Sequence, residues 1–334
     1  MRFEDFIGNA KVIERLRTKL REHRFPHGLL FTGPDGVGKR TCALMFAKAL
    51  NCAENGPDDF CDTCIQCRKI NAGVHSDVLL IGLEDEASEI KIPQIRGLLQ
   101  MLGLRPLEGR HKVFLIDPAD AMNNAAANAL LKALEEPPGD STFILLSANP
   151  QALLVTVRSR CQSYPFGPLT LDEMRRLGGD ELALRWSRGS IGCLKTLDLP
   201  ALRNRRDAAL AFLETAVRAT DEQFRDLIGA SADIARSKSD FESNMSTIAI
   251  LLEDLLYIRE GVPERIVNID VQPRLKKLAE HMAADQLARI AEFLRTIEID
   301  LNRYGNRQML TDALALTANA ALTKIANDNP AKSR

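Results

Sequence analysis

A glycine-rich loop near the N-terminus carries the clearest chemical pattern in the sequence. Its key residues are Gly33, Gly36, Gly38 and Lys39, which lie between a short apolar run and a helical run. Glycines let backbone N–H groups turn inward around phosphate, and a helix N-terminus and a lysine add positive charge. A strand, this loop and a helix in that order predict a phosphate-binding loop, although a glycine-rich turn could match by chance.

The residue after this loop departs from the usual pattern. A serine or threonine there would bind Mg²⁺ through its hydroxyl, but this chain has Arg40. Thr41 comes one residue late, and one residue on a helix is about 100° of rotation, so Thr41 should point away from the metal. We therefore expect a degenerate nucleotide site to which ATP could bind, but with Mg²⁺ poorly positioned.

A second departure follows a later apolar run. Asp117 could end a strand and hold Mg²⁺, but Pro118 stands where a hydrolytic site needs a glutamate to activate water. Asp120 could substitute only in a rearranged loop. The alternative is a buried strand that merely ends in a turn residue. The phosphate loop upstream makes this alternative the weaker one.

Four clustered cysteines predict a metal site. Cys52, Cys61, Cys64 and Cys67 offer four thiolates within one short segment. Zinc bound tetrahedrally by four cysteines is the usual outcome of such a pattern, and a closed site of this kind is structural. An iron–sulfur cluster and four unrelated cysteines are the alternatives.

The elements that must position these residues change character along the chain. In the first half, short apolar runs alternate with helical stretches, including one from Arg40 to about Leu50, and this predicts a parallel α/β sheet with helices on both faces. The expected strands are residues 28–32, 77–81, 112–117, 142–147 and 161–166. Beyond them apolar residues recur at helical spacing. We predict an α/β domain at 1–166, a small helical domain at 167–208 and an all-helical domain at 209–334.

Composition limits the class of protein. The chain has 334 residues, a net charge of −1 and no apolar run long enough to span a bilayer, so we expect a cytoplasmic protein without a membrane partner. The near-neutral charge argues against a protein that coats nucleic acid by bulk charge. In a reducing compartment the cysteines should not form a disulfide framework, and Cys42 and Cys193 should be buried as small apolar side chains.

Several segments resemble the subunits of bacterial clamp loaders, which are AAA+ proteins of the DNA polymerase III holoenzyme. The segments that carry the resemblance are Phe3–Gly8, Ala125–Pro138, Ser159–Cys161, the cysteines between 52 and 67, and Leu301–Arg303 with Asn306 and Leu310. The resemblance covers most of the chain. It implies an AAA+ P-loop domain with a zinc module, followed by a helical lid domain and a helical collar for oligomerisation.

Within that family the chain is similar to either the ATPase subunits, gamma and tau, or the delta-prime subunit. Arg40 and Pro118 each remove a group that hydrolysis needs, and Gly192 lies where the second sensor helix of an active subunit has arginine. These departures and the length of the chain favour the delta-prime type. An active gamma-type ATPase is the alternative, and a zinc-containing nucleic-acid-binding protein unconnected with replication is a more distant one.

The resemblance also implies roles for particular residues. Arg160 would project into a neighbouring subunit's ATP site as an arginine finger, with Arg158 the nearby residue that could be confused with it. Asn149 could be a polar sensor residue or only a turn former. Arg96 and Arg105 could contact DNA or be solvated surface charges. The implied partners are gamma/tau and delta subunits, the sliding clamp and primer–template DNA, and no independent ATPase activity is expected.

Overall fold

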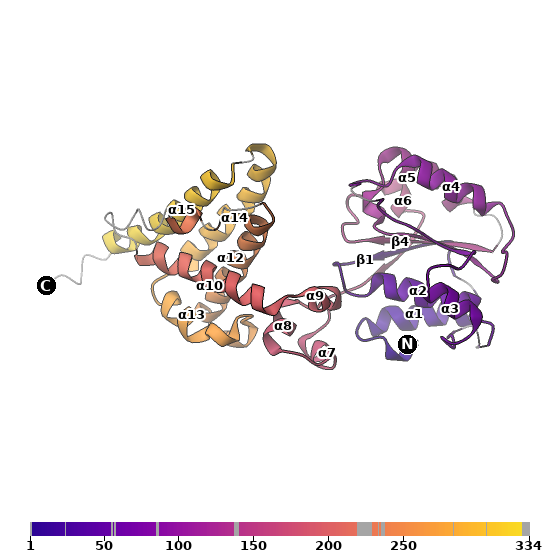
Figure 1. Cartoon of the computed structure of the whole chain (residues 1–334), viewed down its shortest axis with the longest axis horizontal. Helices are drawn as coiled ribbons and strands as arrows, with labels where there is room; N and C mark the ends of the chain where they lie inside the picture. The colour runs from indigo at the N-terminus through magenta and orange to yellow at the C-terminus, as the bar shows by residue number, and fades with distance from the viewer. Residues whose placement is uncertain are drawn as a thin grey trace. The chain divides into compact units, whose positions relative to one another are not determined.

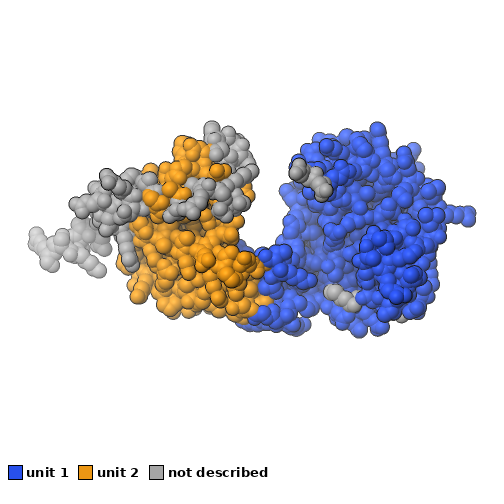
Figure 2. All heavy atoms as spheres, viewed as in Figure 1, with its two compact units in different colours: residues 1–179, 187–196 blue, residues 180–186, 197–334 orange. Residues whose placement is uncertain are grey.

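The computed structural model describes most of the chain as two compact units (Figure 2). The described residues are 2–23, 25–54, 56, 58–84, 87–136, 140–218, 229–232, 234, 238–282, 284–304 and 306–328. The first unit comprises residues 1–179 and 187–196, and the second comprises residues 180–186 and 197–334. Residues 167–208, predicted as a separate lid domain, are thus divided between the two units, and the three predicted domains stay a prediction.

The first unit is built on a parallel sheet, as the sequence predicts. Its strands are β1 (Gly28–Thr32), β2 (Val78–Ile81), β3 (Lys112–Ile116), β4 (Ser141–Ser147) and β5 (Gln162–Pro165), and their order across the sheet is β2-β3-β4-β1-β5. All the pairings are parallel. β1, β3 and β4 are almost continuously apolar because both of their faces are covered.

Helices cover the two faces of this sheet (Figure 1). The elements are η1 (Phe3–Asp5), α1 (Ala10–Arg21), α2 (Lys39–Asn51), α3 (Ile65–Asn71), α4 (Ile92–Leu102), η2 (Ala119–Ala121), α5 (Asn124–Glu135) and α6 (Val155–Arg158). Helices α1 to α3 share one apolar core with alternate strand residues such as Phe31 and Leu115. Helices α4 to α6 share the other core with Leu30 and Phe114. The alternation follows from the two-residue period of a strand.

The rest of the chain is helical. The elements are α7 (Leu171–Arg175), α8 (Glu181–Trp186), α9 (Ile191–Thr196), α10 (Leu199–Arg218), α12 (Lys238–Arg259), η4 (Pro263–Arg265), η5 (Ile269–Val271), α13 (Gln272–Ala279), α14 (Ala284–Tyr304) and α15 (Arg307–Asp328). The periodic apolar residues of the sequence form the core of the second unit, among them Leu213, Ile248, Leu251 and Ile290. Among the described helices, none combines the length and the apolar character that a bilayer crossing requires.

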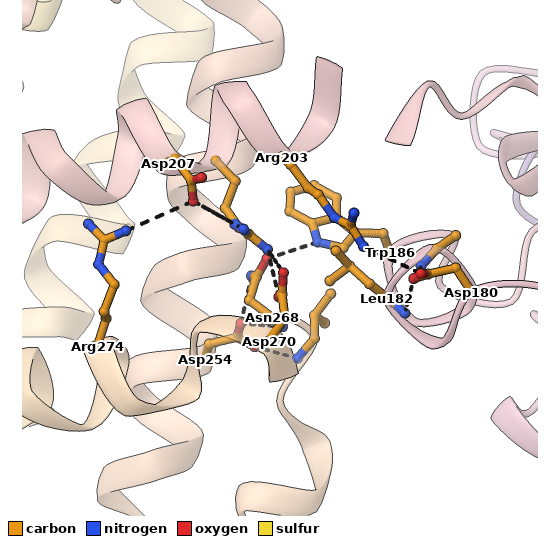
Figure 3. Close-up of polar contacts among 12 residues, drawn as sticks. Asp180, Leu182, Trp186, Arg203, Asp207, Asp254, Asn268, Asp270 and Arg274 are labelled. Carbon is orange, nitrogen blue, oxygen red and sulfur yellow. Dashed lines mark hydrogen bonds and ion pairs between the residues drawn. The ribbon is translucent and has the colours of Figure 1, made fainter. Parts of the chain in front are cut away.

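A buried polar network fixes α8 to the other helices of the second unit (Figure 3). Asp254 on α12 is fully buried, and its carboxylate accepts hydrogen bonds from the backbone N–H groups of Val267 and Asn268, at 2.7 and 2.9 Å. The Asn268 side chain donates to Asp254 at 2.7 Å and accepts from Nε1 of Trp186 at 2.9 Å. Burial raises the pKa of Asp254, against the lowering effect of these donors. The network therefore depends on every partner being present.

Replacing Asn268 with alanine should destabilise the second unit by about 1–3 kcal/mol, because the half-buried Trp186 N–H and the buried Asp254 carboxylate each lose a partner. Trp186 is the only tryptophan, so urea unfolding followed by its fluorescence reports on this site. Asn204→Ala, an exposed position on α10, is the matched control and should show no loss. Equal stability of the two variants would contradict the prediction.

Candidate functional site

The phosphate loop has the backbone conformation that its glycines predict. Gly33, Gly36 and Gly38 have φ values of 137°, 74° and 100°, a region that side chains with a Cβ rarely adopt. A Cβ on Gly33 would also lie 2.1 Å from the carbonyl oxygen of Phe166. Lys39 begins α2, is only 7% exposed, and donates from Nζ to the carbonyl oxygens of Gly33 and Pro34. The loop thus holds a buried cation at a helix N-terminus.

Helix α9 packs directly on this loop, within the first unit. The Gly192 N–H donates to the Gly36 carbonyl at 3.0 Å, and the Ser190 hydroxyl donates to the Asp35 carbonyl at 2.9 Å. A Cβ on Gly192 would lie 2.8 Å from the Cα of Gly36. An arginine at position 192, which the resemblance assigns to active subunits, would therefore require the loop and the helix to separate.

Gly192→Ala should lower the stability of the first unit by about 1–3 kcal/mol, because the added methyl group meets backbone atoms that cannot rotate away. Gly97→Ala on α4 is the matched control, since a Cβ there has nothing within 4 Å. That change should be neutral or stabilising by up to about 1 kcal/mol, as alanine favours a helix over glycine. Denaturant unfolding of both variants measures the difference. A Gly192→Ala variant as stable as the Gly97 variant would contradict the close approach.

A cavity of about 520 Å³ opens beside the loop. Its charged lining residues are Asp5, Asp35, Lys39, Arg40, Asp117 and Lys195. Its apolar lining residues are Phe6, Ile7, Leu177 and Ile191. A cavity of this size, lined by both charged and apolar side chains beside a phosphate loop, suits a small phosphorylated ligand. The sequence identified the loop residues, whereas Phe6, Leu177 and Lys195 reach the cavity from segments with no recognisable spacing relative to the loop.

The residues at the expected metal position do not suit Mg²⁺. Asp117 follows β3 as predicted, but Nη1 of Arg40 lies 3.8 Å from its Oδ2. Burial raises the pKa of Asp117, and the nearby cations Arg40 and Lys39 oppose this only in part. Pro118 supplies no base, and Asp120 in η2 is not among the residues that line the cavity. Thr41 is exposed and lines the cavity, so its predicted turn away from the metal stays a prediction.

Arg160 lies at the opposite edge of the sheet from this loop. It precedes β5, which runs parallel to β1 with Gln162 beside Leu29, whereas the phosphate loop follows the carboxyl end of β1. Its guanidinium forms an ion pair with Glu135 at the end of α5, with 2.7 Å between Nε and Oε1, and it donates to the Thr156 carbonyl at 2.9 Å. The segment Ala125–Pro138, which carries part of the resemblance, contains Glu135, but no sequence pattern pairs this residue with Arg160.

The four predicted ligand cysteines come together. The sulfur atoms of Cys52, Cys61, Cys64 and Cys67 all lie within 4.8 Å of one another. Tetrahedral Zn–S bonds of about 2.3 Å would place sulfur atoms about 3.8 Å apart, so the group fits zinc after a small contraction. Burial acts to raise the pKa of the Cys64 thiol, but N–H donors from Cys67 and Ala53 lower it to about 6, which favours the thiolate.

The other cysteines follow the prediction only in part. Cys42 is buried on α2 as expected. Cys193 is exposed, so its predicted burial is wrong, and the reason is that the short helix α9 buries none of its residues. Cys161 is half-buried beside Arg160, and burial raises the pKa of its thiol to about 12. It therefore remains protonated and packs as a small side chain.

Three other residues singled out in the sequence are exposed on the first unit. Asn149 follows β4, between the strands that lead to the phosphate loop and to Asp117, and its side chain is exposed. Arg96 and Arg105 are exposed. Pro137 and Pro138 lie outside the described residues, and no side chain is described for Leu301–Arg303. Their roles stay predictions.

Comparisons with known proteins point to one family. A family model described as DNA polymerase III, delta subunit, matches residues 8–170. The Escherichia coli DNA polymerase III subunit tau is 32% identical over an alignment of 313 residues, which covers 88% of this chain and 48% of that protein. The Bacillus subtilis delta-prime subunit is 39% identical over 159 residues, 48% of this chain and 47% of that one. The Bacillus subtilis tau subunit is 38% identical over 169 residues, 51% of this chain and 30% of that one.

These relatives are all named as subunits of DNA polymerase III, and the chain spans at most about half of each. The match is supported by the parallel sheet, the phosphate loop after β1 and the helical C-terminal region. By sequence, the chain belongs to the clamp-loader family of AAA+ proteins.

Proposed function

We propose that this chain is a delta-prime-type subunit of a DNA polymerase III clamp loader. In this role it does not hydrolyse ATP itself, and it acts in the cytoplasm as part of the complex that loads the sliding clamp onto primed DNA. It supplies Arg160 in trans to the ATP site of a neighbouring subunit. The names of its relatives, which include tau and delta-prime subunits, support this assignment.

The observation that carries the proposal is the placement of Arg160. A five-residue parallel strand spans roughly 13 Å. Arg160 and the phosphate loop lie at opposite ends of such a strand, so this arginine cannot reach the chain's own cavity. Its side chain is 32% exposed and its counter-ion, Glu135, is 47% exposed. An exposed ion pair of this kind is weak, so a more strongly charged neighbouring site can draw the guanidinium away.

The chain's own site supports the same assignment. The hydroxyl, the catalytic base and the arginine that hydrolysis would need are replaced by Arg40, Pro118 and Gly192. The cavity nevertheless persists, and the buried Lys39 is part of its lining. We propose that the site is a remnant of an ATPase site, and that the partners are gamma/tau and delta subunits, the sliding clamp and primer–template DNA.

A gamma-type ATPase is the second candidate. It is favoured by the retention of Lys39 and Asp117 and by the similarity to a tau subunit over 88% of the chain. The two candidates make opposite predictions for the isolated chain. A gamma-type subunit hydrolyses ATP alone or with its own copies, whereas a delta-prime-type subunit does not.

Reconstitution with purified gamma/tau and delta subunits tests the proposal. Clamp-dependent ATP hydrolysis should require this chain, and the isolated chain should show negligible turnover. Lys39→Ala is a useful control, because it should abolish turnover if the chain is the ATPase and leave the assembled loader active if it is not. Vigorous hydrolysis by the chain alone, or full loader activity without it, would refute the proposal.

A further inference from the structure

The contact between Arg40 and Asp117 places a permanent cation at the position where a phosphate loop otherwise directs a divalent metal. Arg40 is the second residue of α2, and its Nη1 lies 3.8 Å from Oδ2 of Asp117. A guanidinium stays charged throughout the physiological pH range and has no lone pair with which to bind a metal. A divalent ion would meet this fixed positive charge instead of a hydroxyl oxygen. The Arg40 guanidinium beside Asp117 therefore disfavours binding of Mg²⁺ at this position.

The same guanidinium is available to an anion. The Arg40 side chain is 57% exposed, and its distance from Asp117 is longer than a hydrogen bond. Its planar fork carries five N–H donors, which match the oxygens of a phosphate group. Lys39 and Lys195 add positive charge to the lining of the same cavity, which also contains three carboxylates, those of Asp5, Asp35 and Asp117. The glycines of the loop let backbone N–H groups approach. The lining thus offers three cations and backbone donors to a phosphate group.

The apolar residues that line the cavity indicate which chemical group carries the phosphates. Phe6, Ile7, Leu177 and Ile191 form an apolar lining, and the Phe6 ring is close enough that a Cβ on Gly38 would lie 2.8 Å from it. A flat apolar group such as a nucleobase can lie there while its phosphates reach Lys39. The volume of about 520 Å³ is within the usual range for ligands of that size.

We infer that this cavity binds a nucleoside polyphosphate without Mg²⁺, with the Arg40 guanidinium in the place of the metal. The bound nucleotide is then a structural ligand and not a substrate, because Arg40 and Pro118 stand where a metal-binding hydroxyl and a catalytic base would promote attack on it. It keeps α2, the N-terminal segment and α9 together in the first unit. This inference goes beyond the proposed function. It concerns the chain's own cavity and holds whether or not Arg160 acts on a neighbour.

Calorimetric titration of the isolated full chain with ATP and with ADP tests the inference. For the unsubstituted chain, the dissociation constant should differ by less than about twofold between excess EDTA and excess MgCl₂. Arg40→Thr restores the hydroxyl, so it should bind about 10- to 100-fold more weakly in EDTA and regain affinity in MgCl₂. Lys39→Ala should weaken binding in both conditions. Arg96→Thr, an exposed arginine on α4, is the matched control and should change neither.

Electron paramagnetic resonance with Mn²⁺ as the probe gives a readout of the metal itself. With ATP present, the unsubstituted chain should bind no Mn²⁺ beyond that held by free nucleotide, whereas Arg40→Thr should show a protein-bound Mn²⁺–ATP signal. The inference is overturned if Mg²⁺ tightens binding to the unsubstituted chain tenfold or more. It is also overturned if that chain binds Mn²⁺ beside ATP, or binds neither nucleotide in either condition. Thermal unfolding of each variant confirms that the comparison concerns folded protein.

Discussion

Replacing Arg160 with alanine is expected to lower ATP hydrolysis at the neighbouring subunit's site by roughly 10³- to 10⁵-fold, the range for arginine fingers in phosphoryl transfer. A guanidinium stabilises the charge that spreads over the phosphoryl oxygens in the transition state, and water replaces it poorly. The chain itself should fold and assemble normally. The substitution removes an exposed ion pair with Glu135, which is worth at most about 1 kcal/mol.

The measurement needs a loader in which the subunit next to this chain carries the only intact ATP site. Total hydrolysis by a loader with several active sites would dilute the effect. Arg160→Lys keeps the charge but loses the planar fork, so it should recover little of the rate. Arg158→Ala is the matched control. That arginine is two residues away and donates to Gln151 at 3.0 Å, so its loss should leave hydrolysis unchanged. Normal hydrolysis in the Arg160 variant, or equal losses in both, would refute the role.

The strands and the phosphate loop could be predicted because their signals are local. Each strand of the first unit is a short apolar run between helical segments, and β1 leads directly into the loop. The order of strands across the sheet could not be predicted in this way. It depends on pairings between distant segments, such as Gly28 with Phe143 and Lys112 with Ser141. The sequence identified the members of the sheet but not their neighbours.

The ion pairs of the candidate site were missed for the same reason. The sequence showed that Arg40 replaces a hydroxyl, but the approach of its guanidinium to Asp117 requires knowing that β3 and β1 flank β4. Likewise, Glu135 meets Arg160 only because the end of α5 packs beside the turn before β5. In both cases the residue types were visible, while the partner was decided by tertiary structure.

The assignment of α8 to the second unit was also beyond the sequence. A helix of six residues is too short for its apolar pattern to indicate which core it joins. Specific side chains decide it here. Trp186 donates to Asn268, and Arg185 donates to the carbonyl oxygens of Glu264 and Ile266 at 2.9 and 2.7 Å. The neighbouring segment with Gly192 instead packs on the phosphate loop. Residues 167–208, which were predicted as one lid domain, are therefore divided between the two units.

Removal of zinc is expected to unfold the cysteine module and weaken the whole first unit. Cys52, Cys64 and Cys67 are buried in the same core as β1 and α2, and Phe60, from the same segment, packs against Phe3 with ring centroids 5.5 Å apart. A metal that binds only the folded state at 1,000 times its dissociation constant contributes about 4 kcal/mol. For a unit of this size that corresponds to a fall in melting temperature of roughly 8–16 °C.

Metal analysis and thermal unfolding of matched cysteine variants measure this effect. The purified chain should hold one zinc ion, and Cys64→Ser should lose the zinc and melt earlier. Cys193→Ser, at an exposed cysteine outside the cluster, should keep both the zinc and the melting temperature. Bound iron with visible absorbance would indicate an iron–sulfur cluster instead of zinc. A chain that is stable without any metal would contradict the prediction of a metal site. Zinc loss weakens the whole first unit, so it should lower stability and finger function together. Because Arg160 lies outside this module, Arg160→Ala should lower function alone.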